Sequence, residues 1–155
     1  SRVDTIVDEI ISSQNKTSNL LGKVAILNAQ LAYTNFLQKF PQPNSHPIQK
    51  PLWGSTGTKN KNYSDTLYID ELIAPNSVNT VPFETIEKFI DHGLPQKYNG
   101  WNKIKIEKEM EQLNEYNIDL ERITQQLQID GVKVFQDSFS NMLKSIENKC
   151  EILTN

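Results

Sequence analysis

The segment PLWGSTGTKN (residues 51–60) decides the fold, because a short apolar strand runs directly into a small polar loop. We expect the strand from Pro51 to Ser55. A second short strand is expected from Val78 to Val81, with one short helix between the two. The order strand, helix, strand is typical of a βα unit, in which the two strands pair in parallel.

The loop after the first strand carries the kinds of group from which a phosphate site is built. Gly54 and Gly57 are expected to let the backbone turn tightly and bring its N–H groups close to a ligand. Ser55 and Thr56 add hydroxyl donors, and Lys59 adds a positive charge. A phosphate dianion needs such converging donors and a cation. The spacing is not that of a P-loop, and an ordinary glycine- and serine-rich turn is the alternative interpretation.

Composition limits the classes of function. The chain has 155 residues, a net charge of -3 and a pI near 5.4, so we expect one ordinary domain without nucleic acid as a generic partner. No apolar run approaches the roughly 18 residues of a membrane span. The single cysteine, Cys150, cannot form an internal disulfide, which fits a reducing compartment, and a cytoplasmic protein is expected.

The sequence favours neither a metal nor a cofactor. His46 lies in a connector rich in proline and asparagine, and His92 lies at a predicted helix end. Neither has Cys, Asp or Glu at the spacing of metal ligands, so no zinc site is expected.

Apolar periodicity predicts helices over most of the remaining chain. They are expected over residues 3–11, from Ser18 to Phe40, from Ser64 or Asp65 to Leu72, from Pro82 to His92, from Lys103 to Tyr116, from Asp119 to Gln128, and from Val132 past Cys150. Gly93 is expected to end one helix and Gly131 to separate the last two. The helix from Pro82 is expected to turn Phe83, Ile86, Phe89 and Ile90 inward.

So few strands cannot complete an α/β domain, in which about a fifth to a quarter of the residues would lie in sheet. Two or three parallel strands leave open edges and an uncovered sheet face. The chain also starts without methionine, at Ser1. We therefore expect part of a larger fold.

Longer motifs resemble one family. PLWGSTGTKN, NYSDTLYIDELIAP and VNTVPFETIEKFIDHG resemble the seventh and eighth βα units of transaldolases of the longer, bacterial-type branch. The opening SRVDTIVDEI resembles the end of the sixth strand and its helix, GKVAILNAQLAY the helix before strand seven, and GVKVFQDSFSNMLKSIE the C-terminal helix. The resemblance implies that residues 1–155 are the C-terminal part of a single α/β domain, a (β/α)8 TIM barrel of the class I aldolase type.

The resemblance also implies an activity. Transaldolases transfer a dihydroxyacetone unit in the pentose phosphate pathway, from sedoheptulose 7-phosphate to glyceraldehyde 3-phosphate, giving erythrose 4-phosphate and fructose 6-phosphate. An active-site lysine forms a Schiff base with the donor, and no cofactor is needed. That lysine lies on the fourth strand and the carboxylates on the first and third, which all precede Ser1. We therefore expect this chain to hold binding residues and no catalytic ones.

Four residues are candidates for binding the substrate phosphate. Arg2 falls where the family has an arginine after strand six, and Lys59 matches the cation after strand seven. Ser55 and Thr56 are both candidates for the hydroxyl of that site. The competing interpretation is a non-catalytic module that binds sugar phosphates or a helical interaction protein, with Arg2 and Lys59 as solvated side chains. The sequence leaves the oligomeric state open.

Overall fold

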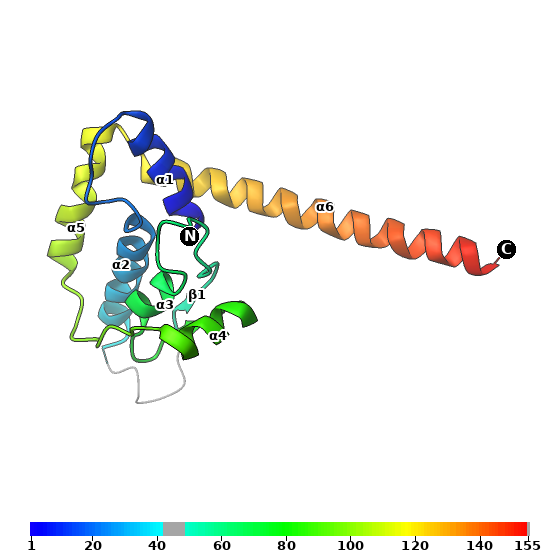
Figure 1. The fold of residues 1–155 in the computed structure, drawn as a ribbon, viewed down its shortest axis with the longest axis horizontal. Helices are drawn as coiled ribbons and strands as arrows, with labels where there is room; N and C mark the ends of the chain where they lie inside the picture. The colour runs from blue at the N-terminus through cyan, green and yellow to red at the C-terminus, as the bar shows by residue number, and fades with distance from the viewer. Residues whose placement is uncertain (42–48, 155) are drawn as a thin grey trace. The chain divides into compact units, whose positions relative to one another are not determined.

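The computed structural model describes residues 1–41 and 49–154, so His46 lies outside the described residues. The chain divides into two compact units, Ser1–Ile118 and Asp119–Asn155, and each is described by itself (Figure 1).

The first unit follows the predicted order of helices and strands. Its elements are α1 (Arg2–Ser13), α2 (Val24–Lys39), β1 (Leu52–Trp53), α3 (Leu67–Leu72), β2 (Val78–Asn79), α4 (Phe83–His92), α5 (Lys103–Glu111) and the 3-10 helix η1 (Gln112–Tyr116). The predicted helix from Lys103 to Tyr116 is thus an α-helix whose last turns tighten into a 3-10 helix, a common helix ending.

The two strands pair in parallel, as the order strand, helix, strand predicts. Leu52 is opposite Val78 and Trp53 is opposite Asn79. The Val78 N–H donates to the Pro51 carbonyl oxygen and the Thr80 N–H to that of Trp53, both at 2.9 Å. The strands are shorter than predicted. The first ends because Ser55, with φ of 58°, leaves the extended conformation.

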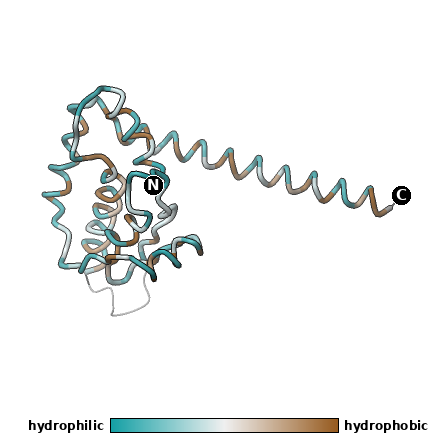
Figure 2. The backbone as a smooth tube through the Cα atoms, in the orientation of Figure 1, coloured by the Kyte–Doolittle hydropathy of each residue, from teal (hydrophilic) through white to brown (hydrophobic). Residues whose placement is uncertain are grey.

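Helix α2 lies at the centre of the first unit and packs against α1, α3 and α5. Figure 2 shows hydrophobic segments along it. One buried cluster joins Ile26 and Tyr33 of α2 to Trp53 of β1 and to α3. The Tyr33 ring meets that of Trp101 edge to face, with centroids 5.0 Å apart. Aromatic and aliphatic burial therefore fixes β1 and α3 against α2.

The predicted start of α2 at Ser18 is wrong, because the helix begins at Val24. Gly22 has a left-handed φ of 69°, which interrupts the helical conformation before that point. Two carboxylates of α1 accept hydrogen bonds from backbone N–H groups at this point. Asp8 Oδ1 accepts from the Gly22 N–H (3.0 Å), and Asp4 Oδ1 accepts from the Ala25 N–H (2.7 Å). The start of α2 is thus set by side chains from α1.

Helix α4 has the predicted ends but not the predicted buried face. It ends before Gly93 as expected, and it begins at Phe83, one residue after the predicted first residue Pro82. However, Phe83 is 73% and Ile90 is 78% exposed, and Ile86 is exposed as well. The buried residue of this helix is the polar Thr85. The described residues leave the apolar face of α4 largely uncovered.

The second unit contains one helix, α6 (Leu120–Thr154). The predicted break at Gly131 is wrong, because the helix continues through this residue. A glycine inside a helix costs only about 1 kcal/mol relative to alanine, and regular apolar spacing continues on both sides. Exposed apolar residues recur along α6 at Val132, Phe135, Phe139, Met142, Leu143 and Ile146.

Among the helices of the described residues, none combines the length and the apolar character needed to cross a membrane.

Candidate functional site

The start of α1 lies beside the loop that follows β1. The backbone nitrogen of Ser1 donates a hydrogen bond to the carbonyl oxygen of Ser55 at 3.0 Å. Arg2, the first residue of α1, lines a cavity of about 320 Å³ together with Ser55 and Thr56. The structure therefore brings together three of the four predicted phosphate-binding residues.

This loop turns at Ser55 and not at its glycines. Ser55 has the left-handed φ, whereas Gly54 and Gly57 lie outside that region. A Cβ atom on Gly54 would come no closer than 4.0 Å to Thr80 Oγ1, an ordinary van der Waals contact that an alanine could make. The expectation that the two glycines supply the tight turn is therefore wrong.

The hydroxyl groups of Ser55 and Thr56 have different surroundings. Thr56 is only 3% exposed, and its Oγ1 donates to Asn79 Oδ1 (2.8 Å) and to the Thr80 carbonyl oxygen (3.1 Å). Its hydroxyl proton is therefore used to tie the loop to the end of β2. Ser55 is exposed at the edge of the cavity. Of the two hydroxyls, that of Ser55 is the accessible one.

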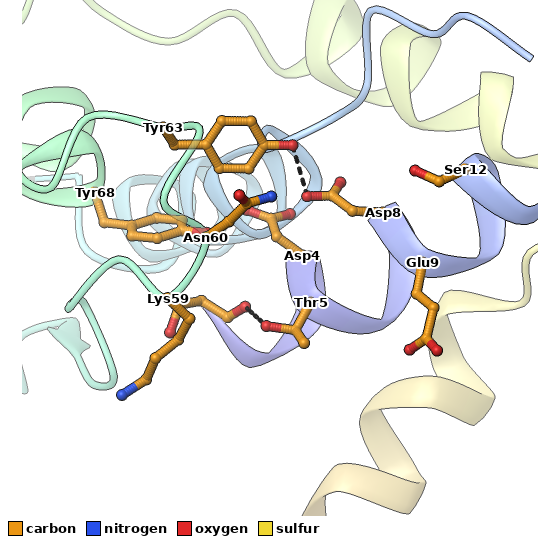
Figure 3. Close-up of a pocket in the computed structure, with 10 residues that line it drawn as sticks. Asp4, Thr5, Asp8, Glu9, Ser12, Lys59, Asn60, Tyr63 and Tyr68 are labelled. Carbon is orange, nitrogen blue, oxygen red and sulfur yellow. Dashed lines mark hydrogen bonds between the residues drawn. The ribbon is translucent and has the colours of Figure 1, made fainter.

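Lys59 is set apart from the other three predicted residues. It lines one cavity of about 340 Å³ with Asp4 and Asp8, and another of about 540 Å³ with Lys88. In Figure 3 its ammonium group points away from both carboxylates. The cavity that contains Arg2 is not lined by Lys59.

Asp4 and Tyr68 form a buried polar contact between α1 and α3. The Tyr68 hydroxyl donates to Asp4 Oδ2 at 2.7 Å, while Ala25 N–H donates to the other oxygen. Burial raises the pKa of the Asp4 carboxyl, and these two hydrogen bonds act against that shift. Burial and the nearby Asp4 charge also raise the pKa of Tyr68. The Tyr68 hydroxyl and the Asp4 carboxylate thus satisfy each other's hydrogen-bonding requirement.

Asp8 makes a second contact of this kind, one helical turn further on. The Tyr63 hydroxyl donates to Asp8 Oδ2 at 2.8 Å, as Figure 3 shows. Burial and this hydrogen bond raise the pKa of Tyr63 to about 12. Since each oxygen of Asp8 accepts a hydrogen bond from another segment, this carboxylate ties α1 to Gly22 and to Tyr63.

The sequence interpretation missed both carboxylates. A signal was present, because Asp4 and Asp8 are spaced i, i+4 and flank Val7 and Ile11 on the apolar side of α1. An acidic residue on a buried helix face needs a donor from another element. The sequence does not say which element supplies it.

Within residues 1–41 and 49–154, no group of three or more His, Cys, Asp or Glu side chains is placed to share a metal ion.

A parallel βα unit whose loop borders a cavity with both apolar and polar lining residues is the class of structure found in α/β barrels, where loops after late strands commonly bind phosphate. A family model described as Transaldolase/Fructose-6-phosphate aldolase matches residues 1–146. The chain belongs to this family, which has the TIM-barrel fold, and the predicted fold class is confirmed.

Named relatives agree with this assignment. The chain is 36% identical over 159 residues to the transaldolase of Parafrankia sp. (strain EAN1pec), covering 96% of this chain and 43% of the relative. It is 35% identical over 155 residues to the transaldolase of Mycobacterium tuberculosis (strain ATCC 25618 / H37Rv), covering 93% of this chain and 42% of the relative. The chain thus spans less than half the length of these curated relatives, in their C-terminal part.

Proposed function

We propose that this chain supplies the phosphate-binding side of a transaldolase. The enzyme is a transferase that moves a dihydroxyacetone unit between sugar phosphates in the cytoplasmic pentose phosphate pathway. Membership of the transaldolase/fructose-6-phosphate aldolase family supports this function. The observation that carries it is the cavity in which Arg2 and Ser55, distant in sequence, lie together.

We propose a role for each of the four predicted residues from its position. Arg2 offers a guanidinium group, which can form two parallel hydrogen bonds to a phosphate. Ser55 offers an accessible hydroxyl beside it, and Thr56 holds the loop in position through its bonds to Asn79 and Thr80. Lys59, which does not line the Arg2 cavity, would add positive charge from the far end of the loop.

We further propose that the nucleophilic lysine lies in the part of the family that this chain does not span. The lysine amine would condense with the donor ketone, with loss of water, to form the Schiff base. The present chain would hold the phosphate end of the sugar while this reaction proceeds. It would then bind substrate without forming the covalent intermediate by itself.

Phosphate binding is tested by calorimetric titration of the chain with fructose 6-phosphate, with fructose as the matched ligand that lacks phosphate. Replacing Arg2 by Gln should weaken fructose 6-phosphate binding by about tenfold to a hundredfold, the usual effect of losing a charge-assisted pair. Ser55→Ala should weaken it less, since it removes one neutral donor. Equal binding of fructose and fructose 6-phosphate would contradict the proposed site.

The transferase activity is tested by complementation. The chain is co-expressed with the part of the Parafrankia transaldolase that it does not span, and transfer from fructose 6-phosphate is measured with borohydride trapping in parallel. We expect a trapped lysine in the Parafrankia part and transfer activity that Arg2→Gln reduces. A trapped lysine in residues 1–155 would show that the nucleophile was wrongly placed, and an assembled complex without transfer would contradict the function.

A further inference from the structure

The connection between α4 and α5 contains the dipeptide Asn99–Gly100. No other asparagine of the 155-residue sequence is followed by glycine. The pair lies in the segment 93–102, which is neither helical nor part of a sheet, and both residues are exposed. It therefore stands in contact with water, in a part of the first unit that no helix or strand restrains.

An asparagine followed by glycine is open to one particular reaction with water. The backbone nitrogen of the following residue attacks the side-chain carbon Cγ, and the amide nitrogen leaves as ammonia together with the proton of the attacking N–H. Water then opens the five-membered ring at either carbonyl, which gives aspartate or isoaspartate. Glycine permits the attack because it has no Cβ atom in the way. Asparagine is accordingly one of the thermolabile residues of proteins.

The fold leaves the reacting atoms of this pair without hydrogen bonds. Within the described part of the chain, none involves the Gly100 N–H or the Asn99 side chain. A Cβ atom placed on Gly100 would meet no described atom within 4 Å apart from its chain neighbours. At Asn117 the situation differs, because the following N–H, that of Ile118, donates to the Leu113 carbonyl oxygen at 3.1 Å. The structure thus exposes one asparagine to the reaction and restrains the other.

Aromatic residues hold the chain on both sides of the pair. The Tyr98 and Trp101 rings both meet the buried Tyr33 ring edge to face, with centroids 5.5 Å and 5.0 Å away, and each other at 5.1 Å. Residues 99 and 100 therefore span two fixed points. An isoaspartyl bond would add one carbon atom to the backbone between them, so the aromatic contacts would have to adjust.

The surroundings of Asn99 do not oppose a new negative charge. Asn99 lines a cavity of about 470 Å³ between α2, α5 and this connection. Its charged lining residues are Lys23, Lys97, Lys105, Glu71 and Glu109. Because the three lysines outnumber the two glutamates, a carboxylate at position 99 would reduce an excess of positive charge.

We propose that Asn99–Gly100 is a site of non-enzymatic modification, at which water converts Asn99 to aspartate or isoaspartate in the folded chain. The reaction adds one negative charge beside the lysines and lengthens the backbone next to Trp101 in the isoaspartyl product. This inference does not rest on the proposed transaldolase activity, because neither residue lines the Arg2 cavity.

The test is incubation of the 155-residue chain at mildly alkaline pH, folded and in urea, followed by peptide mapping with mass spectrometry. We expect Asn99 to lose its amide nitrogen in the folded chain at a rate within about threefold of that in urea, because no opening of the fold is needed. Electron-transfer fragmentation identifies the isoaspartyl bond. Asn117 is the internal control and should react more slowly, and Asn99→Gln should abolish the reaction at position 99.

Reaction of Asn99 in urea but not in the folded chain would overturn the proposal, since the loop would then protect the pair. Equal rates at Asn99 and Asn117 in the folded chain would overturn it as well.

The structural effect is tested on the isoaspartyl fraction, separated by anion exchange. Its melting temperature should fall by about 2 to 8 °C relative to Asn99→Asp, a variant that carries the charge without the extra backbone carbon. Equal melting temperatures would show that the aromatic contacts of Tyr98 and Trp101 do not fix the span between them.

Discussion

Helices α2 and α4 differ in a way that their sequences do not suggest. Apolar and polar residues are segregated more sharply around α4 than around α2. Yet α2 buries Val24, Ile26 and Tyr33, whereas α4 leaves Phe83 and Ile90 exposed. An amphipathic pattern therefore predicts a helix and the direction of its apolar face. It does not predict whether a neighbour in the same chain segment covers that face.

The two helices are also held by different forces. Helix α2 is held by the apolar cluster and by the buried carboxylates Asp4 and Asp8 at its start. Helix α4 is held through exposed ion pairs of Lys88 and His92 with Asp65. Buried contacts of the first kind stabilise by several kcal/mol, while exposed ion pairs typically contribute about 0 to 1 kcal/mol.

The largest effect is expected when the same substitution is made in both helices. Ile26→Ala in α2 should lower the free energy of unfolding by about 2 to 5 kcal/mol, because it opens a cavity in the buried cluster. Ile90→Ala in α4 should change it by no more than about 0.5 kcal/mol, since this side chain is already exposed. Urea unfolding followed by circular dichroism measures both. If both variants lose the same free energy of unfolding, the apolar face of α4 is covered in solution.

An intermediate effect is expected at the start of α2. Asp4→Ala should lower the free energy of unfolding by about 1 to 3 kcal/mol, because the Ala25 N–H and the Tyr68 hydroxyl lose their acceptor. Glu9→Ala, at an exposed position of the same helix, is the control and should be close to neutral. If both variants unfold at the same urea concentration, the buried carboxylate does not anchor α2.

The smallest effect concerns the attachment of α4 and depends on pH. Hydrogen bonds raise the pKa of His92 above 6.5, and those from His92 and Lys88 lower the pKa of Asp65 below 3.8. The contribution of the His92–Asp65 pair to the stability of the fold is therefore fully present between pH 3.8 and pH 6.5. It is lost as pH rises through the folded pKa of His92, and as pH falls through that of Asp65.

His92→Gln tests this dependence. The difference in melting temperature between the chain and the variant should be greatest at about pH 5 to 6 and should shrink towards about pH 9. Asp91→Asn removes the second partner of the ring and should therefore lower the pKa of His92, so that His92 loses its charge at a lower pH. A difference that stays constant with pH would indicate that His92 acts through packing alone.

The elements that the sequence predicted best are those with local signals. Pro82 and Gly93 mark the ends of α4 locally: the helix ends at His92 as expected and begins within one residue of the expected start. The start of α2 was mispredicted because Asp4 and Asp8, on another helix, determine it. Gly131 does not end a helix as expected, because the helix propensity of the surrounding residues outweighs the cost of one glycine.

The candidate site shows the same division between local and distant information. The loop after β1 was found from its residue types, which are local. The separation of Ser55 from Thr56 depends on Asn79 and Thr80, which belong to the next βα unit. The position of Lys59 outside the Arg2 cavity depends on where the loop turns, and that turn is at Ser55, a residue without the usual preference for it.

The parallel pairing of β1 with β2 also has a consequence for the order of folding. The Val78 and Thr80 amides bond to Pro51 and Trp53, so the chain must close a long loop around α3 before either bond exists. Non-local strand pairing of this kind forms more slowly than the local contacts within a helix. Protection of these two amide protons from exchange with solvent is therefore expected to appear after helix α3, which lies between the two strands, has formed.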